Sequence, residues 1–198
     1  MILAELTSIP TEDLPLAEFR AHLRLGSGFA DDTLQHEVLE SYLRAAIAAI
    51  EARIGKMLYE RRVSWTLTRW SRDEAQPLPV APVTRVESVV LTDRSGAETT
   101  VAAETYVLMK DTHRPQIAAV GAALAGIAQG GSVTVVFDAG YGVTWAAIPP
   151  DLREAVFLLA GHYYEQRNDT SGAGGLMPFG VMALLDPYRN IRLFGART

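Results

Sequence analysis

The side chains of this sequence that could do chemistry are four histidines, a few adjacent acids and one glycine turn. His162 and Glu165 are three positions apart, so on a helix they would share a face and could both reach one metal ion. A zinc site needs more than two protein ligands, and the chain has no second His-x-x-Glu pair and no cysteine. We therefore interpret His162 and Glu165 as the polar end of a helix.

The other motifs also lack the parts that catalysis or nucleotide binding requires. Gly140-Tyr141-Gly142 is not followed by the Gly-Lys-Ser/Thr of a phosphate loop. The HEVLE segment at His36 lacks the second histidine of HExxH, and Ser27 lies in no G-x-S-x-G elbow. Asp31-Asp32 and Asp73-Glu74 are read as a helix cap and a solvated turn, not as a glycosidase pair. The sequence therefore predicts a protein that is not an enzyme, with no cofactor and no metal.

The glycine turn and the prolines that follow it are instead expected to position a helix. Gly140 and Gly142 should end a strand and permit positive φ in a sharp turn. Pro150 presets the start of a helix, and Asp151 lies in its first turn, where the helix dipole favours a negative charge. This helix should extend to Arg167 with apolar residues on two faces, so we expect neighbours on both sides.

Two more helices are predicted near the start of the chain. Leu16, Phe19 and Leu23 recur at helical spacing after Pro15. The strongest helical pattern runs from Thr33 to about Leu58, with a broad apolar stripe. Its many alanines would allow close approach of another helix, so this helix is expected to have more than one partner.

Alternating side chains begin at Arg61, where RRVSWTLTRW places Val63, Trp65 and Leu67 on one face of a strand. Further strands are expected in VTRVESVVLTD, ETYVLMK, RPQIAAV and GSVTVVFDAGYG, with Gly96 at the tip of a turn. The predicted fold class is therefore α+β: a helical core of a short helix, a long helix and C-terminal helices, with a β-strand module inserted between the long helix and the C-terminal helix. The β subdomain is expected over 61–141, within a single domain.

Composition narrows the classes of partner. The net charge of −5 argues against a protein that grips DNA or RNA through phosphates, although DNA could still slide past such a surface. The absence of cysteine excludes disulfides and thiol chemistry and fits a reducing compartment. The sequence also contains no apolar run long enough to span a bilayer, and no leader is expected.

Two sets of residues are predicted to contact other proteins. After a glycine-rich break, residues 176–198 combine apolar side chains with arginines, which is typical of interfaces. The same segment could instead fold back on its own helices, and the sequence leaves both options open. The predicted docking residues are Leu184, Leu185, Tyr188, Arg189, Ile191, Arg192, Leu193 and Phe194. The predicted subunit-interface residues on the long helix are Tyr42, Ala45, Ala49 and Arg53.

The order of these segments resembles the head–tail connector (adaptor) proteins of tailed bacteriophages and of the related gene transfer agents. LAEFRAHLRL followed by DDTLQHEVLESYLRAAIAAIEARIGKML is similar to the opening of that family, and PVTRVESVVLTDRSG to its β segment. GSVTVVFDAGYGVTWAAIPPDLREAVFLLAGHYYEQR is similar to its most characteristic stretch. The likeness extends to about Arg167, but short family members are nearly all helical, so the β module is an addition.

The resemblance implies a structural protein of the neck of a virion or gene transfer agent particle, made in the bacterial cytoplasm. It implies one connector domain over residues 1–198 and a dodecameric ring beneath the portal protein. DNA would pass through the ring without specific binding, and a tail-completion or stopper protein would attach to it. The docking segment 176–198 is then expected to bind the portal, and no membrane contact is implied.

Two alternatives remain open at this point. One is a small-molecule-binding or enzymatic domain built on the β module, with a pocket formed by Trp65, Trp70, Tyr106 and Trp145. The other is a different protein of the same neck, a stopper or a tail terminator.

Overall fold

The computed structural model describes residues 1–25, 32–166 and 177–189, and its chain divides into two compact units. One unit is made of Met1–Ile9 and Lys56–Val143 and contains the strands. The other is made of Pro10–Gly55 and Thr144–Thr198 and contains the α-helices. All strands from β2 to β8 lie between the second and third α-helices in the sequence, so the predicted α+β class with an inserted β module is confirmed.

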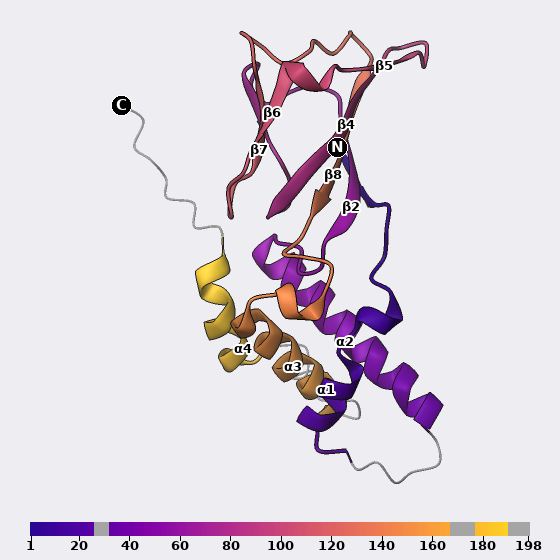
Figure 1. Cartoon of the computed structure of the whole chain (residues 1–198), viewed down its shortest axis with the longest axis vertical. Coiled ribbons are helices and arrows are strands. Elements are labelled where there is room, and N and C mark those ends of the chain that lie inside the picture. The colour runs from indigo at the N-terminus through magenta and orange to yellow at the C-terminus, as the bar shows by residue number, and fades with distance from the viewer. Residues whose placement is uncertain (26–31, 167–176, 190–198) are drawn as a thin grey trace. The chain divides into compact units, whose positions relative to one another are not determined.

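The β unit contains two antiparallel sheets (Figure 1). The five-stranded sheet has the order β1 (Ile2–Glu5), β2 (Arg61–Leu67), β8 (Ser132–Ala139), β4 (Val83–Thr92) and β5 (Glu98–Thr100). The three-stranded sheet has the order β3 (Ala75–Pro77), β7 (Gln116–Ala119) and β6 (Tyr106–Met109). A short 3₁₀ helix, η2 (Ala103–Thr105), precedes β6.

Both sheets contribute to one apolar core. In β2 the alternation predicted from the sequence is confirmed, because Val63, Trp65 and Leu67 are buried while Ser64 and Thr66 are half-buried. Strand β8 pairs with β2 on one side and β4 on the other, so it is the centre of the larger sheet. The core residues shared by the two sheets include Val63, Trp65, Leu67, Val89, Val133, Val135, Phe137, Leu78, Ile117 and Leu124.

Three strands were not expected from the sequence. Strand β1 lies in an unpatterned ILAE segment, and β5 is a short polar ETT segment, so neither shows alternation. Strand β3 lies in the proline-rich stretch DEAQPLPVAP, which shows no strand alternation, and it ends at Pro77 on the edge of its sheet, where proline costs no ladder bond. Each of these strands is defined by its pairing with a distant segment.

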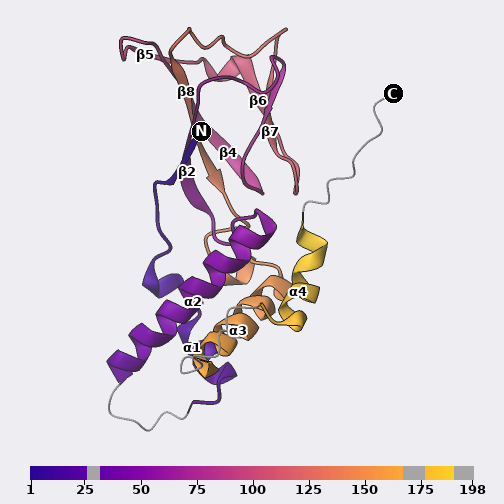
Figure 2. The same ribbon diagram turned by 180° about the vertical axis from the view of Figure 1, so that it is seen from behind.

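The helical unit contains η1 (Thr11–Asp13), α1 (Leu16–His22), α2 (Asp32–Ile54), η3 (Trp145–Ala147), α3 (Pro150–Glu165), α4 (Phe179–Leu185) and η5 (Asp186–Tyr188). Helix α3 packs against α2 and α4, and both views show it between them (Figures 1 and 2). The prediction that this helix has neighbours on two sides is therefore confirmed. Among the described residues, no helix has both the length and the apolar character needed to cross a bilayer.

The prediction that the long helix continues to Leu58 is wrong. Gly55 has φ +67, a conformation that ends a helix and that glycine adopts without strain. Met57 and Leu58 are buried as expected of apolar residues, but they lie in an extended segment whose Met57 N–H donates to the carbonyl of Ala81 at 2.9 Å. Their burial in the core produced the apparent continuation of the stripe.

The glycine turn after β8 brings two chain segments into close contact. Gly140 has φ +139, and a Cβ at this position would lie 2.3 Å from the carbonyl oxygen of Tyr59. The Glu60 N–H donates to the carbonyl of Gly142 at 2.8 Å, so segment 58–60 runs beside the turn. The prediction of positive φ is confirmed for Gly140 and wrong for Gly142. The turn is a scaffold, as interpreted from the sequence.

Candidate docking surface

A groove in the helical unit lies between the end of α2 and the segment formed by α4 and η5. It has a volume of about 210 Å³. Arg53 comes from α2, and its Nη2 atom lies 3.9 Å from the sulfur of Met182 on α4. The Phe179 side chain is 82% exposed at the start of α4. The lining residues are Arg53, Phe179, Met182, Ala183, Leu185, Asp186 and Arg189. Arginine, methionine and an exposed aromatic are the side chains enriched in protein interfaces.

Local sequence explains why α4 is held at this position. Pro178 presets the start of the helix, and the Met182 N–H donates to its carbonyl at 3.1 Å. Val181 and Leu185 are four positions apart and both buried, so one face of α4 packs inward, against α3. Phe179 and Met182 lie on the remaining surface of α4 and line the groove together with Leu185.

The predicted docking residues divide into two groups. Leu185 is buried and Leu184 half-buried, while Tyr188 is half-buried and bonded to Asp151 of α3. Arg189 is exposed and lies 3.4 Å from the carboxylate of Asp186. These side chains are brought together beside the groove, and their binding of another protein stays a prediction. Ile191, Arg192, Leu193 and Phe194 lie outside the described residues.

The predicted interface residues on α2 are also separated by the structure. The Tyr42 ring meets Tyr164 edge-on with centroids 6.1 Å apart, so Tyr42 already has a partner in its own chain. Ala49 is half-buried, whereas Ala45 is exposed and Arg53 lines the groove. Ala45 belongs to a row of small exposed residues at helical spacing on one face of α2. The row consists of Ser41, Ala45, Ala48 and Ala52. Contact with another subunit stays a prediction for this face.

The aromatic residues proposed as a small-molecule pocket do not meet at one place. Trp145 belongs to the helical unit, where its indole N–H donates to Glu18 at 2.9 Å and its ring packs on Phe157. Trp65 is buried in the β core, and the Trp70 indole donates to the carbonyl of Ala125. Tyr106 and Trp70 line a cavity of about 10 Å³, room for a single water molecule. That cavity is too small for a ligand, so a pocket built on these residues is not favoured.

His162 and Glu165 both line a wider cavity of about 470 Å³ in the helical unit. His162 is half-buried and Glu165 exposed. Across the described part of the chain, His, Asp and Glu side chains form no group of three or more that could hold a metal ion.

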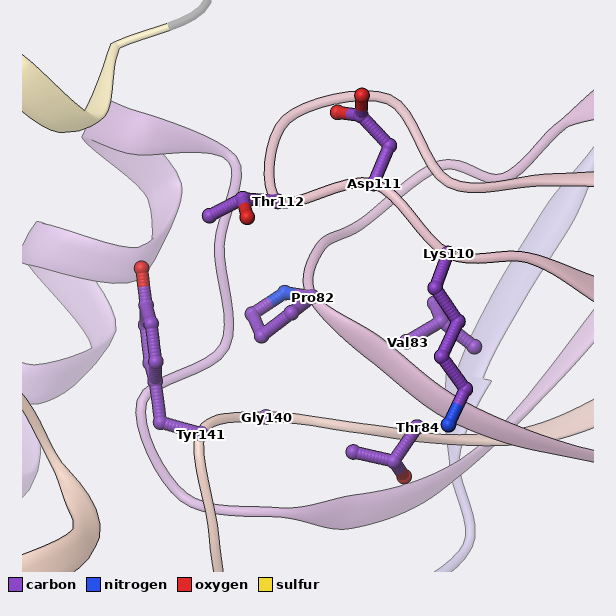
Figure 3. Close-up of a pocket in the computed structure, with 8 residues that line it drawn as sticks. All are labelled: Pro82, Val83, Thr84, Lys110, Asp111, Thr112, Gly140 and Tyr141. Carbon is purple, nitrogen blue, oxygen red and sulfur yellow. The ribbon is translucent and has the colours of Figure 1, made fainter.

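A cavity of about 390 Å³ in the β unit lies between the β6–β7 turn and the start of β4 (Figure 3). Behind this turn Lys56 is buried and donates its ammonium to the carbonyl oxygen of Thr112. Burial lowers the pKa of Lys56, and the nearby charge of Asp111 partly offsets this effect. In Figure 3 the Lys110 and Asp111 side chains point away from each other. The cavity residues therefore do not converge on a reacting centre.

Asp111 fixes the conformation of this turn. Its carboxylate accepts hydrogen bonds from the backbone N–H groups of Arg114 at 2.6 Å and His113 at 2.7 Å. These two bonds lower the pKa of Asp111. The turn is thus held by an acid that remains ionised at neutral pH.

A charged cluster connects three neighbouring strands of the larger sheet. Asp138 on β8 accepts hydrogen bonds from Arg62 on β2 at 2.9 Å and from Arg85 on β4 at 2.8 Å. The bond from Arg62 is the largest cause that lowers the pKa of Asp138, followed by that from Arg85, although burial opposes both. Sequence reasoning missed this cluster, because the three residues meet only through the order of the strands.

Within the described residues, the functional features are thus a groove with interface chemistry, exposed apolar residues and structural ion pairs. These features fit a protein that assembles with other proteins. Comparison with solved structures identifies the assembly. A chain from the neck of an empty GTA particle, computed with C6 symmetry, is 51% identical over 100% of both chains, with a TM-score of 0.90. A chain from the virion of a native gene transfer agent (GTA) particle is 51% identical over 100% of both chains, with a TM-score of 0.87.

A third chain, from the neck of a native GTA particle computed with C12 symmetry, is 48% identical over 100% of both chains, with a TM-score of 0.84. The protein belongs to the head–tail connector family, in its gene transfer agent form, and its role is structural, in the particle neck. The resemblance stated from the sequence is therefore confirmed. No protein-family model matches the chain. No curated protein matches it either.

Proposed function

We propose that the chain is one subunit of a connector ring between the portal protein of the capsid and a tail-completion or stopper protein. A ring of twelve copies agrees with the twelvefold symmetry used for the neck of a native particle. The observation that carries the proposal is the 51% identity, over the full length of both chains, to a neck component. In this role residues 1–198 act as one connector domain with an inserted β subdomain at 61–141, and no catalysis is required.

The C-terminal residues are proposed to dock on the portal. The groove at α4 offers Phe179 as an exposed aromatic anchor, with Arg53 and Arg189 beside it. Residues 190–198 add apolar side chains and arginines next to this groove in the sequence. A partner segment with apolar and acidic side chains would match this surface.

The exposed stripe of small residues on α2 is proposed as a helix-packing contact between subunits. Ala45 lies in this stripe, and small side chains allow backbones of two helices to approach closely. DNA would pass through the ring without specific binding, since the chain has a net charge of −5 and would repel phosphates overall.

Truncation after Arg189 tests the docking role. Val181 and Leu185 are buried, so a truncation that removed α4 would damage the core as well as the docking surface. Deleting only 190–198 retains α4 and η5. We expect the truncated protein to keep the helical circular dichroism and melting temperature of the full chain but to join no tails to filled heads.

A matched pair of point variants tests the groove. Phe179→Ala removes an exposed aromatic from the groove, and Val143→Ala removes an exposed apolar side chain from the β unit. We expect only Phe179→Ala to lower the yield of tailed particles, by tenfold or more. A tenfold loss of affinity corresponds to about 1.4 kcal/mol of binding free energy. Normal head–tail joining by both the truncation and Phe179→Ala would refute docking through this segment.

A further inference from the structure

The two sheets of the β unit have four edge strands, and two of them carry the features that block pairing with another chain. Strand β3 ends in Pro77, which lacks the N–H needed for pairing. Strand β5 has only three residues, all exposed and polar, and includes Glu98. Charge, proline and short length are the usual means by which edge strands avoid unwanted association.

The other two edge strands, β1 and β6, are more apolar: neither contains proline, and Glu5 is the one charged residue among them. Strand β1 reads ILAE and β6 reads YVLM, and each has four residues. Ile2 is 68% and Leu3 44% exposed, although they point to opposite faces of β1. Val107 and Met109 on the outer face of β6 are 49% and 50% exposed, while Tyr106 and Leu108 pack toward the core. Figure 1 labels β6 beside β7, and the N-terminal strand lies beside β2.

Exposed apolar side chains concentrate at these two edges. Among the described residues, seven of the eleven large apolar side chains that are exposed lie in or next to β1 and β6. They are Met1, Ile2, Leu3, Leu6, Val107, Met109 and Val120. Apolar edge strands promote aggregation when nothing covers them, so an apolar edge indicates that another chain covers it.

We propose that β1 of one copy of this chain pairs with the outer edge of β6 of the next copy, so that the two sheets become continuous across the subunit boundary. This proposal rests on the proposed ring. A ring repeats one head-to-tail contact, so each subunit must present two different surfaces that fit each other. Strands β1 and β6 differ in sequence and lie in different sheets, so they are two different surfaces of one subunit. Their equal length of four residues allows them to pair along their whole length.

The paired strands would satisfy backbone groups that each edge leaves open to solvent. The Leu6 N–H donates to the carbonyl of Arg62 at 2.8 Å, in register with the β1–β2 ladder. Alternation along an antiparallel ladder then directs the N–H groups of Leu3 and Glu5 to the outer edge. Backbone bonds from this edge give affinity, and Ile2, Leu3, Val107 and Met109 supply the apolar contact.

The natural absence of cysteine permits a sharp test by disulfide trapping. Strands that pair place opposite Cα atoms about 4.5 to 5.5 Å apart, within the range that a disulfide spans. Leu3→Cys with Val107→Cys, and Leu3→Cys with Met109→Cys, are introduced into chains assembled in particles, which are then mildly oxidised. We expect one of the double variants to give a ladder of covalent multimers on a non-reducing gel. Each single variant should give no species larger than a dimer.

The control places the second cysteine on an exposed apolar residue of α2, as Leu3→Cys with Val38→Cys. It should give no ladder. Particles that contain the chain but give no ladder with either double variant would overturn the β1–β6 contact and leave the ring itself standing. Absence of the chain from purified particles would instead refute the proposed ring and, with it, this contact.

A second variant covers the case in which cysteines disturb assembly. Leu3→Lys and Val107→Lys each add a charge at an exposed position, so both should fold with an unchanged melting temperature. We expect each to reduce incorporation into particles at least tenfold. Incorporation equal to that of the Val38→Lys control would contradict the proposal.

Discussion

The hydroxyl of Tyr188 lies 2.7 and 2.8 Å from the two carboxylate oxygens of Asp151 and donates its hydrogen bond to that carboxylate. Asp151 lies in the first turn of α3, where the helix dipole also favours its negative charge. Tyr188 closes η5, directly after α4. This bond therefore fastens the segment that carries the groove to the central helix of its unit.

Replacing Tyr188 by phenylalanine should loosen this attachment. Loss of a half-buried hydrogen bond to a carboxylate should lower the free energy of unfolding of the helical unit by about 1 to 2 kcal/mol. Asp151→Asn, which keeps the shape but removes the charge, should have a similar effect. Urea unfolding followed by circular dichroism measures both changes. A loss below about 0.3 kcal/mol for both variants would show that the bond does not hold η5.

Gly140→Ala should be among the most destabilising single changes in the β unit. The added Cβ would lie 2.3 Å from the Tyr59 carbonyl oxygen and 2.4 Å from the Glu60 Cα, at φ +139. We expect a loss of about 3 kcal/mol or more, from backbone strain and steric overlap together. Gly96→Ala is the matched control, since it has φ +88 but nothing within 4 Å of the added Cβ. It should cost only about 1 kcal/mol. Equal losses in thermal unfolding would argue against the close approach.

Acid should weaken the β unit through Asp138. Hydrogen bonds from Arg62 and Arg85 hold the pKa of Asp138 below its ordinary value, so the folded state binds this proton less readily than the unfolded state. The contribution is therefore complete above about pH 4 and is lost as the pH falls through the folded-state pKa.

The measurement for Asp138 compares urea midpoints at about pH 7 and about pH 3. Asp138→Asn should be less stable than the natural chain at neutral pH and should lose less on acidification. Glu104→Gln, at an exposed position of η2, is the control and should keep the natural pH dependence. If Asp138→Asn keeps that dependence unchanged, the cluster does not contribute as described.

Lys56 should give a pH dependence of the same sign, but in the alkaline range. Burial lowers the pKa of Lys56, so between the folded-state pKa and about pH 10.4 the unfolded chain binds more protons than the folded chain. Stability should therefore rise with pH in that window. Lys56→Met should remove this rise, whereas Lys110→Met, which removes an exposed lysine from the cavity of Figure 3, should not. Parallel stability curves for the two variants up to about pH 9.5 would contradict this assignment.

Much of the fold could be predicted because its signals are local. The alternation of Val63, Trp65 and Leu67 indicates a strand with one buried face, and the prolines before Asp151 indicate the start of α3. What escaped prediction depends on distant partners. Strand β1 forms because it pairs with residues Val63 to Thr66 of β2, which are far away in the sequence. The Asp138 cluster forms because β8 lies between β2 and β4.

The docking residues show the same division. Apolar residues and arginines after the glycine-rich break predicted docking through this segment, and the structure places Leu185 and Arg189 at the groove. The sequence could not indicate that Leu185 would be buried in its own chain, or that Phe179 would be the exposed aromatic. Those assignments depend on which face of α4 meets α3, and the one-dimensional pattern of a seven-residue helix does not fix that face.

The central claim is that this chain forms the connector ring of a gene transfer agent neck. The most direct measurement is electron cryomicroscopy of particles in which the exposed turn at Gly96 carries a small inserted label domain. We expect label density in one ring between the capsid portal and the tail, with twelve copies as in the related neck of twelvefold symmetry. Label on the capsid shell or along the tail, or normally joined particles that contain none of the labelled chain, would contradict it.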